Sequence, residues 1–68
     1  MATPVKKFHK SGTLHATGQE EDDLPVGYWE WFREDGTKKR SGQFERGEPR
    51  GEWITYDAAG RVHKVTQR

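Results

Sequence analysis

The sequence contains no cysteine and carries a net charge of only +1 at pH 7. Without thiols the chain cannot form disulfides, thiolate zinc sites or a cysteine nucleophile. Its near-neutral charge gives no strong overall field that would recruit nucleic acid or an anionic membrane. No apolar stretch approaches the length of a membrane span, and residues 1–8 do not resemble a signal peptide. We therefore expect a cytoplasmic protein, and the composition disfavours nucleic acid and membranes as its partners.

Apolar residues are also scarce, at 29% of the chain against 34% charged residues, which approaches the composition of disordered proteins. The aromatic residues oppose this trend, because they make up 12% of the chain and each buries roughly 150–250 Å². The glycines and prolines recur at regular intervals, as they do between the elements of a folded chain. We expect one small domain over residues 1–68 with a thin core, in which a second copy or another protein supplies extra burial.

A repeat with a period of 24 residues organises the chain, because 11 of the 44 positions that can be compared at this offset are identical. About 3 identities would be expected by chance at average residue usage. The matched positions include Gly12, Gly36 and Gly60; the aromatic residues Phe8, Phe32 and Tyr56; and the pairs Gly18 and Gly42, Gly27 and Gly51, Pro25 and Pro49, and Trp29 and Trp53. Phe44 is a further structural position of the second unit. The predicted units span about 4–27, 28–51 and 52–68, the last one incomplete.

Each unit predicts a β-hairpin: an aromatic strand, a tight turn containing glycine, and a more polar second strand. The expected strands cover about 4–9, 14–19, 28–33, 37–44, 52–56 and 61–66, and residues 45–51 are expected to form a loop. Connections this short exclude parallel crossovers. The predicted fold is therefore all-β: a single-layer, curved, six-stranded antiparallel meander of tandem hairpins.

A three-residue turn at 34–36 predicts the pairing of the strands on either side of it. It places Phe32 opposite Lys38, and the same rule in the other units places Phe8 opposite Leu14 and Tyr56 opposite Val62. Without a bulge, the rule also pairs Glu30 with Arg40 and Tyr28 with Gly42. Alternation then sorts side chains onto two faces. One is expected to hold Phe8, Leu14, Tyr28, Phe32, Phe44, Ile54, Tyr56 and Val62, and the other Val5, Trp29, Trp31, Trp53 and Val65 with Lys7, His15, Lys39 and Gln43.

Two segments resemble the MORN-repeat variant family, including its bacterial antitoxin-like members. They are Gly27-Tyr28-Trp29-Glu30-Trp31-Phe32-Arg33-Glu34-Asp35-Gly36 and Gly42-Gln43-Phe44-Glu45-Arg46-Gly47. The resemblance covers nearly the whole chain. It implies hairpins stacked edge to edge in a module that contacts partner proteins, as related repeats contact proteins and membrane lipids. The first unit departs from the pattern, with Glu20 at the Phe44 position and Val5 at the tryptophan position, which suggests a cap or a weakened repeat.

The candidate interaction surface consists of Trp29, Trp31 and Trp53 with the cations Lys39 and His63, and Lys7 beside them. Tryptophan next to basic residues suits a protein interface, where both supply much of the binding energy. The same arrangement suits stacking of single-stranded bases. The alternative is that the tryptophans form the core on the concave side of the sheet.

Other polar groups are interpreted as ordinary surface. The acidic run Glu20-Glu21-Asp22-Asp23 lacks the ligand alternation of a calcium loop, and Lys38-Lys39-Arg40 divides between the two faces. His15 and His63 fall on the second and sixth strands, and His9 with His15 gives at most two ligands. Ser11 and Ser41 lie in no nucleophile motif. We expect no metal, no cofactor and no enzymatic activity.

The function predicted from the sequence is a non-enzymatic protein-interaction or scaffold module whose partner is another protein or a second copy of the chain. Weak binding of single-stranded nucleic acid or an anionic lipid headgroup is the first alternative. Antitoxin-like inhibition of a partner protein is the other. A fold does not dictate its ligand, so these functions stay open at the level of sequence.

Overall fold

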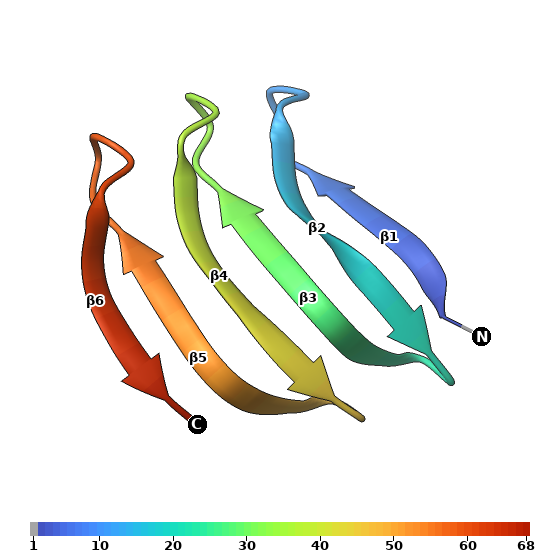
Figure 1. The fold of residues 1–68 in the computed structure, drawn as a ribbon. Helices are drawn as coiled ribbons and strands as arrows, with labels where there is room; N and C mark the ends of the chain where they lie inside the picture. The colour runs from blue at the N-terminus through green and yellow to red at the C-terminus, as the bar shows by residue number, and fades with distance from the viewer. Residues whose placement is uncertain (1) are drawn as a thin grey trace.

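The computed structural model describes residues 2–68 as one antiparallel sheet in which the order of the strands follows the order of the chain (Figure 1). This confirms the predicted all-β meander. The described residues form six strands and no helix, so no helix among them could cross a membrane. The strands are β1 (Thr3–Phe8), β2 (Leu14–Glu21), β3 (Leu24–Phe32), β4 (Lys38–Glu45), β5 (Glu48–Tyr56) and β6 (Val62–Gln67).

Three turns that contain glycine join β1 to β2, β3 to β4 and β5 to β6 at one end of the sheet (Figure 1). In the second, the Gly36 N–H donates to the Arg33 carbonyl at 2.9 Å, and Gly36 takes a φ of 91°, which L side chains rarely adopt. The Asp35 carboxylate accepts bonds from the hydroxyl and the backbone N–H of Thr37 at 2.6 and 2.9 Å. These bonds favour the charged form and hold the pKa of Asp35 below its ordinary value of 3.8.

The two turns at the opposite end of the sheet are shorter than the sequence predicts. Asp22 and Asp23 have φ angles of 53° and 65°, and two consecutive positive φ values are characteristic of a two-residue type I′ hairpin. Arg46 and Gly47 form the second such turn, with φ angles of 50° and 84°. The predicted loop over 45–51 is therefore wrong, since β5 already begins at Glu48.

Proline favours a loop in this segment, and the register explains why a strand accommodates it instead. Glu21 and Leu24 close the first tight turn, and Glu20 faces Pro25 next to them. Hydrogen-bonded and non-bonded pairs alternate along an antiparallel ladder, and the closing pair of a two-residue hairpin is bonded. Pro25 therefore occupies a non-bonded pair, where β2 requires no N–H from it. Pro49 has the same position opposite Phe44.

The predicted pairs next to the glycine turns are confirmed: Phe8 with Leu14, Phe32 with Lys38 and Tyr56 with Val62. Beyond them each hairpin has one extra residue on its second strand, at His15, Lys39 and His63, and these β-bulges shift the remaining register by one.

The shift overturns several predicted pairs and side-chain positions. Glu30 pairs with Ser41 instead of Arg40, and Trp29 instead of Tyr28 lies opposite Gly42. Since residues beyond a bulge exchange faces, three of the predicted face assignments are wrong. Gln43 lies opposite Tyr28 and Val65 lies opposite Ile54, so both are on the face away from the tryptophans. Phe44 lies on the same face as the tryptophans.

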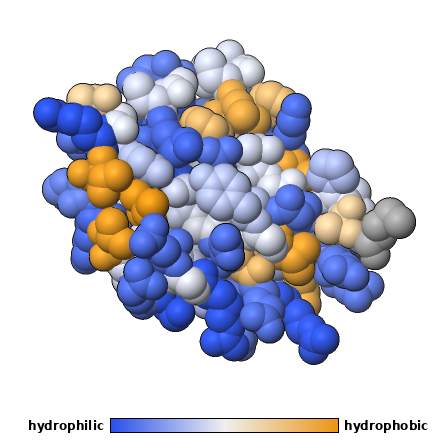
Figure 2. Space-filling model, in the orientation of Figure 1, coloured by the Kyte–Doolittle hydropathy of each residue, from blue (hydrophilic) through white to orange (hydrophobic). Residues whose placement is uncertain are grey.

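The molecule is a slab whose extents are 34 × 30 × 13 Å, so its thickness is that of a single layer. Among residues 2–68 only Ala16, Trp29, Trp53 and Ser41 have buried side chains. Large apolar side chains remain exposed, including Phe8 at 61% and Val62 at 59%. Figure 2 shows separate apolar groups among hydrophilic residues, one of them on the side where Figure 1 places β5 and β6.

Candidate interaction surface

The three tryptophans lie together on one face of the sheet, as the sequence predicts, and Phe44 completes the group. Trp31 stacks on Trp29 with ring centroids 5.9 Å apart and lies tilted against Trp53 with centroids 5.5 Å apart. Phe44 meets Trp53 edge-on at 5.1 Å and Trp29 at 6.2 Å. Aromatic pairs at such distances add about 0.5–1.5 kcal/mol beyond the area they bury. We call Trp29, Trp31, Phe44 and Trp53 the tryptophan cluster, and the side of the sheet that carries it the tryptophan face.

Two glycines of the repeat allow the indoles to lie against the sheet. A Cβ atom at Gly18 would lie 2.1 Å from Cδ2 of Trp29, and one at Gly42 would lie 2.2 Å from Cδ2 of Trp53. Each ring therefore covers bare backbone, and only 3% of Trp29 and 9% of Trp53 remain exposed. These two tryptophans form the core of the sheet, whereas Trp31 is half-buried and accessible.

Hydrogen bonds through Gln19 fix the indole of Trp29. The Trp29 indole N–H donates to the Gln19 carbonyl at 3.1 Å. The Gln19 side-chain amide donates to the carbonyls of Val26 and Tyr28, both at 2.7 Å, where the register between β2 and β3 is interrupted. The corresponding Trp53 indole N–H is buried and has no partner among the described residues.

A second set of bonds joins consecutive hairpins at the end of the glycine turns. The His9 ring donates through Nε2 to the Phe32 carbonyl at 3.0 Å. One repeat later, Arg33 donates to the Tyr56 carbonyl at 2.8 Å and to the Asp57 carbonyl at 3.2 Å. We call these side chains the clasps, because each connects its own hairpin to the next.

The third residue at the clasp position, Asp57, behaves differently. Its carboxylate accepts bonds from the backbone N–H groups of Ala59 and Arg61 at 2.9 and 3.0 Å, within its own turn. A carboxylate also cannot donate to a carbonyl. The third hairpin, β5 and β6, therefore lacks the donor by which each of the first two hairpins bonds to the next one.

The two predicted cations of the surface are not part of the tryptophan cluster. Lys39 and His63 are the extra residues of two bulges, and both are exposed. Lys7 pairs with Ala16 on β2, and Ala16 pairs with Trp31 on β3, so Lys7 lies two strands away from the nearest tryptophan. Their contact with a partner stays a prediction.

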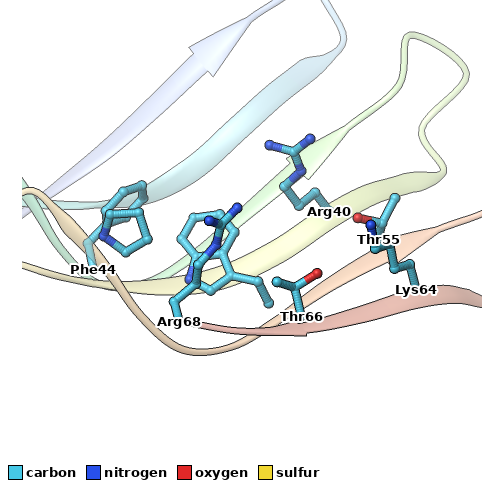
Figure 3. A pocket seen from close by; sticks show the side chains of 8 residues that line it. Arg40, Phe44, Thr55, Lys64, Thr66 and Arg68 are labelled. Atoms are coloured by element: carbon cyan, nitrogen blue, oxygen red, sulfur yellow. The ribbon is translucent and has the colours of Figure 1, made fainter.

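The residues that sequence reasoning missed line a hollow of about 400 Å³ beside Trp53. Three cations, Arg40 on β4, Lys64 on β6 and Arg68 just after it, surround this hollow on the tryptophan face (Figure 3). No ion pair joins any of them to a residue within 2–68. The period could have revealed this site, because Arg68 stands one repeat after Phe44 and Lys64 one repeat after Arg40.

The opposite face, which we call the tyrosine face, has a small polar centre. Lys38 forms an ion pair with Glu30 at 2.5 Å, and its ammonium lies 5.5 Å from the centroid of the Tyr56 ring. The bond to the Glu30 carboxylate raises the pKa of Lys38 above its ordinary value of 10.5. Because the Lys38 side chain is a third exposed, solvent screens this pair and its contribution to stability is small.

The rings of His9 and His15 approach each other near the first turn, with centroids 4.6 Å apart. Within residues 2–68 no group of three or more histidine, aspartate or glutamate side chains is arranged to hold a metal ion. Two imidazoles alone make a poor metal site.

No known family model, curated protein or solved structure matches this chain. The resemblance to MORN-repeat variants is therefore still a prediction from the residues, and the function has to be inferred from the geometry of the sheet.

Proposed function

We propose that the chain is a non-enzymatic, cytoplasmic protein-interaction module of MORN-like repeats. One observation carries the proposal: a sheet one layer thick has apolar side chains on both faces, and no second layer among residues 2–68 covers either of them. Apolar side chains that the fold itself leaves uncovered are candidate contacts for a partner. Phe8, Tyr28, Val62 and Val65 remain between 48% and 61% exposed on the tyrosine face.

The tryptophan face supplies the rigid part of such a module. Trp29 and Trp53 are fixed by their glycines, so they hold Trp31 at the surface without large loss of side-chain freedom on binding. Rigid aromatic side chains presented from a scaffold are characteristic binding hot spots. The accessible part of the predicted surface is then Trp31 with the exposed Lys39 and His63.

Affinity capture from the native cell tests this proposal. We would compare the wild-type chain with Trp31→Ala and with the pair Lys39→Ala and His63→Ala, and confirm folding of each by circular dichroism. A partner that the wild type retains and both variants lose supports the proposal. As a matched control, Glu34→Ala changes an exposed turn residue outside this surface and should retain the partner.

Light scattering on the purified chain completes the test, because a second copy would occupy the same surface. A concentration-dependent dimer that Trp31→Ala dissociates identifies the partner as the chain itself. A strict monomer that captures the same proteins as all of its variants would contradict the proposal.

A further inference from the structure

In the sheet formed by residues 2–68, β6 is an edge strand, and the hydrogen bonds show which of its backbone groups are available. Gly51 and Arg68 exchange two backbone bonds, at 3.2 and 2.9 Å. Bonded pairs recur every second residue, so Thr66 and Lys64 are also bonded to β5. The N–H and C=O groups of Val65 and Gln67 therefore point outward, toward the position of an additional strand.

The side chains next to these outward groups determine what kind of strand would fit. Lys64, Thr66 and Arg68 alternate with them and project onto the tryptophan face, beside the hollow that Arg40 and Trp53 also line (Figure 3). Lys64 and Arg68 are four residues apart, roughly 13 Å along a strand. Carboxylates on every second residue of an added strand would reach cations that have no ion-pair partner within residues 2–68.

The same charges argue against a second copy of this chain at the edge. Pairing β6 with β1 of another copy would bring Lys6 and Lys7 close to these cations, and pairing β6 with β6 would place like charges together. A second copy placed next to β6 would also meet no clasp, because Asp57 replaces the donors His9 and Arg33.

Single-stranded nucleic acid is favoured less than a peptide. Base stacking requires an accessible aromatic face. Trp53, the aromatic ring of the hollow nearest the edge, is 9% exposed, with one face over Gly42 and Phe44 packed edge-on against it. An unpaired strand edge, in contrast, matches the backbone of an extended peptide.

From these observations we infer that the β6 edge binds an acidic, extended segment of a partner protein as an added strand. The inference rests on the proposed function and names the chemistry of the partner. Val65 and Gln67 supply the backbone bonds, while Arg40, Lys64 and Arg68 select carboxylates on the side chains of the added strand that face the hollow.

The test is an NMR titration of the ¹⁵N-labelled chain with an acetylated peptide in which glutamate and valine alternate. The largest shifts are expected at the amides of Val65 and Gln67. The variant Lys64→Glu with Arg68→Glu should weaken binding at least about tenfold, because two attractive pairs become repulsive. The control Lys6→Glu with Lys10→Glu makes the same charge change at the β1 side and should alter the affinity less than about twofold.

A backbone variant checks the strand geometry separately. Val65→Pro removes an outward N–H that β5 does not use, a position where an edge strand accepts proline, and it should abolish binding. Shifts confined to another part of the sheet, unchanged affinity in the Lys64→Glu, Arg68→Glu variant, or tighter binding of oligothymidylate at the same amides would overturn the inference. If the peptide does not bind, but Trp31→Ala still loses a captured protein that the wild type retains, the assignment of the β6 edge is wrong and the proposed function stands.

Discussion

Consecutive hairpins meet along two seams, one between β2 and β3 and the other between β4 and β5. The two seams use equivalent positions of the repeat but are held by different chemistry. Both have an indole lying over a glycine, Trp29 over Gly18 and Trp53 over Gly42. The first seam adds polar bonds, in which Gln19 contributes both its carbonyl and its amide.

The second seam adds aromatic contact and a stronger clasp instead. Phe44 packs edge-on against Trp53, whereas its counterpart in the first unit is Glu20. Arg33 makes two bonds to carbonyls of the next hairpin, where His9 makes one. A repeat thus keeps the geometry of its seams, while the source of their stability varies from one seam to the next.

The largest effect is expected where the seams are alike. Gly18→Ala and Gly42→Ala would each place a Cβ within 2.6 Å of three indole atoms, so the ring must leave its position. We expect each to lower the free energy of unfolding by roughly 3 kcal/mol, measured by urea denaturation.

The control for this prediction removes the clash. In a Trp29→Val background, Gly18→Ala should cost less than about 1 kcal/mol, so a double-mutant cycle isolates the contact. If alanine at Gly18 and Gly42 were tolerated equally well with the tryptophans present, the indoles would not lie against the glycine backbone.

A smaller effect should distinguish the two clasps. Arg33→Met loses charge-assisted bonds to two carbonyls of the next hairpin and to its own Lys38 carbonyl at 3.1 Å, which we expect to cost about 2 kcal/mol. His9→Leu loses a single bond and should cost about 1 kcal/mol. Thermal unfolding of both variants measures the difference, with Arg33→Lys as a control that keeps the charge without the planar fork. Equal losses would show that the seams do not differ in this respect.

The smallest effect concerns the two indole N–H groups. Trp29→Phe and Trp53→Phe remove similar apolar area, but only Trp29 donates a hydrogen bond to a residue of 2–68. Trp29→Phe should therefore cost about 1 kcal/mol more than Trp53→Phe in the free energy of unfolding. A difference near zero would mean that the bond to the Gln19 carbonyl makes no net contribution.

The repeat was sufficient to predict the six strands, their order and the pairs beside the glycine turns, because these depend on local turn chemistry. It was not sufficient to place Phe44 on the correct face, because that face depends on a bulge at Lys39. No residue type in this segment indicates such a bulge. Nor did it predict that Pro25 and Pro49 lie within strands, since that depends on which pairs of the ladder are hydrogen-bonded.

The candidate surface was predicted in part for a similar reason. Tryptophan is recognisable in the sequence, and the structure does bring Trp29, Trp31 and Trp53 together. The hollow joins side chains of β4, β5 and β6 that are separated along the chain. Its cations Arg40, Lys64 and Arg68 form no motif, and only the repeat, which aligns Lys64 with Arg40, indicates them.

The agreement between strand order and chain order has a consequence for folding and exchange with solvent. No long loop has to close before a hairpin can form, so we expect rapid folding from local contacts. Each outer hairpin is held by one seam only, and such units open first in native-state hydrogen exchange. The third hairpin can therefore separate from β4 while the central strands stay paired. A segment that binds along β6 would slow this opening, and the partner would then act as a lock on the end of the sheet.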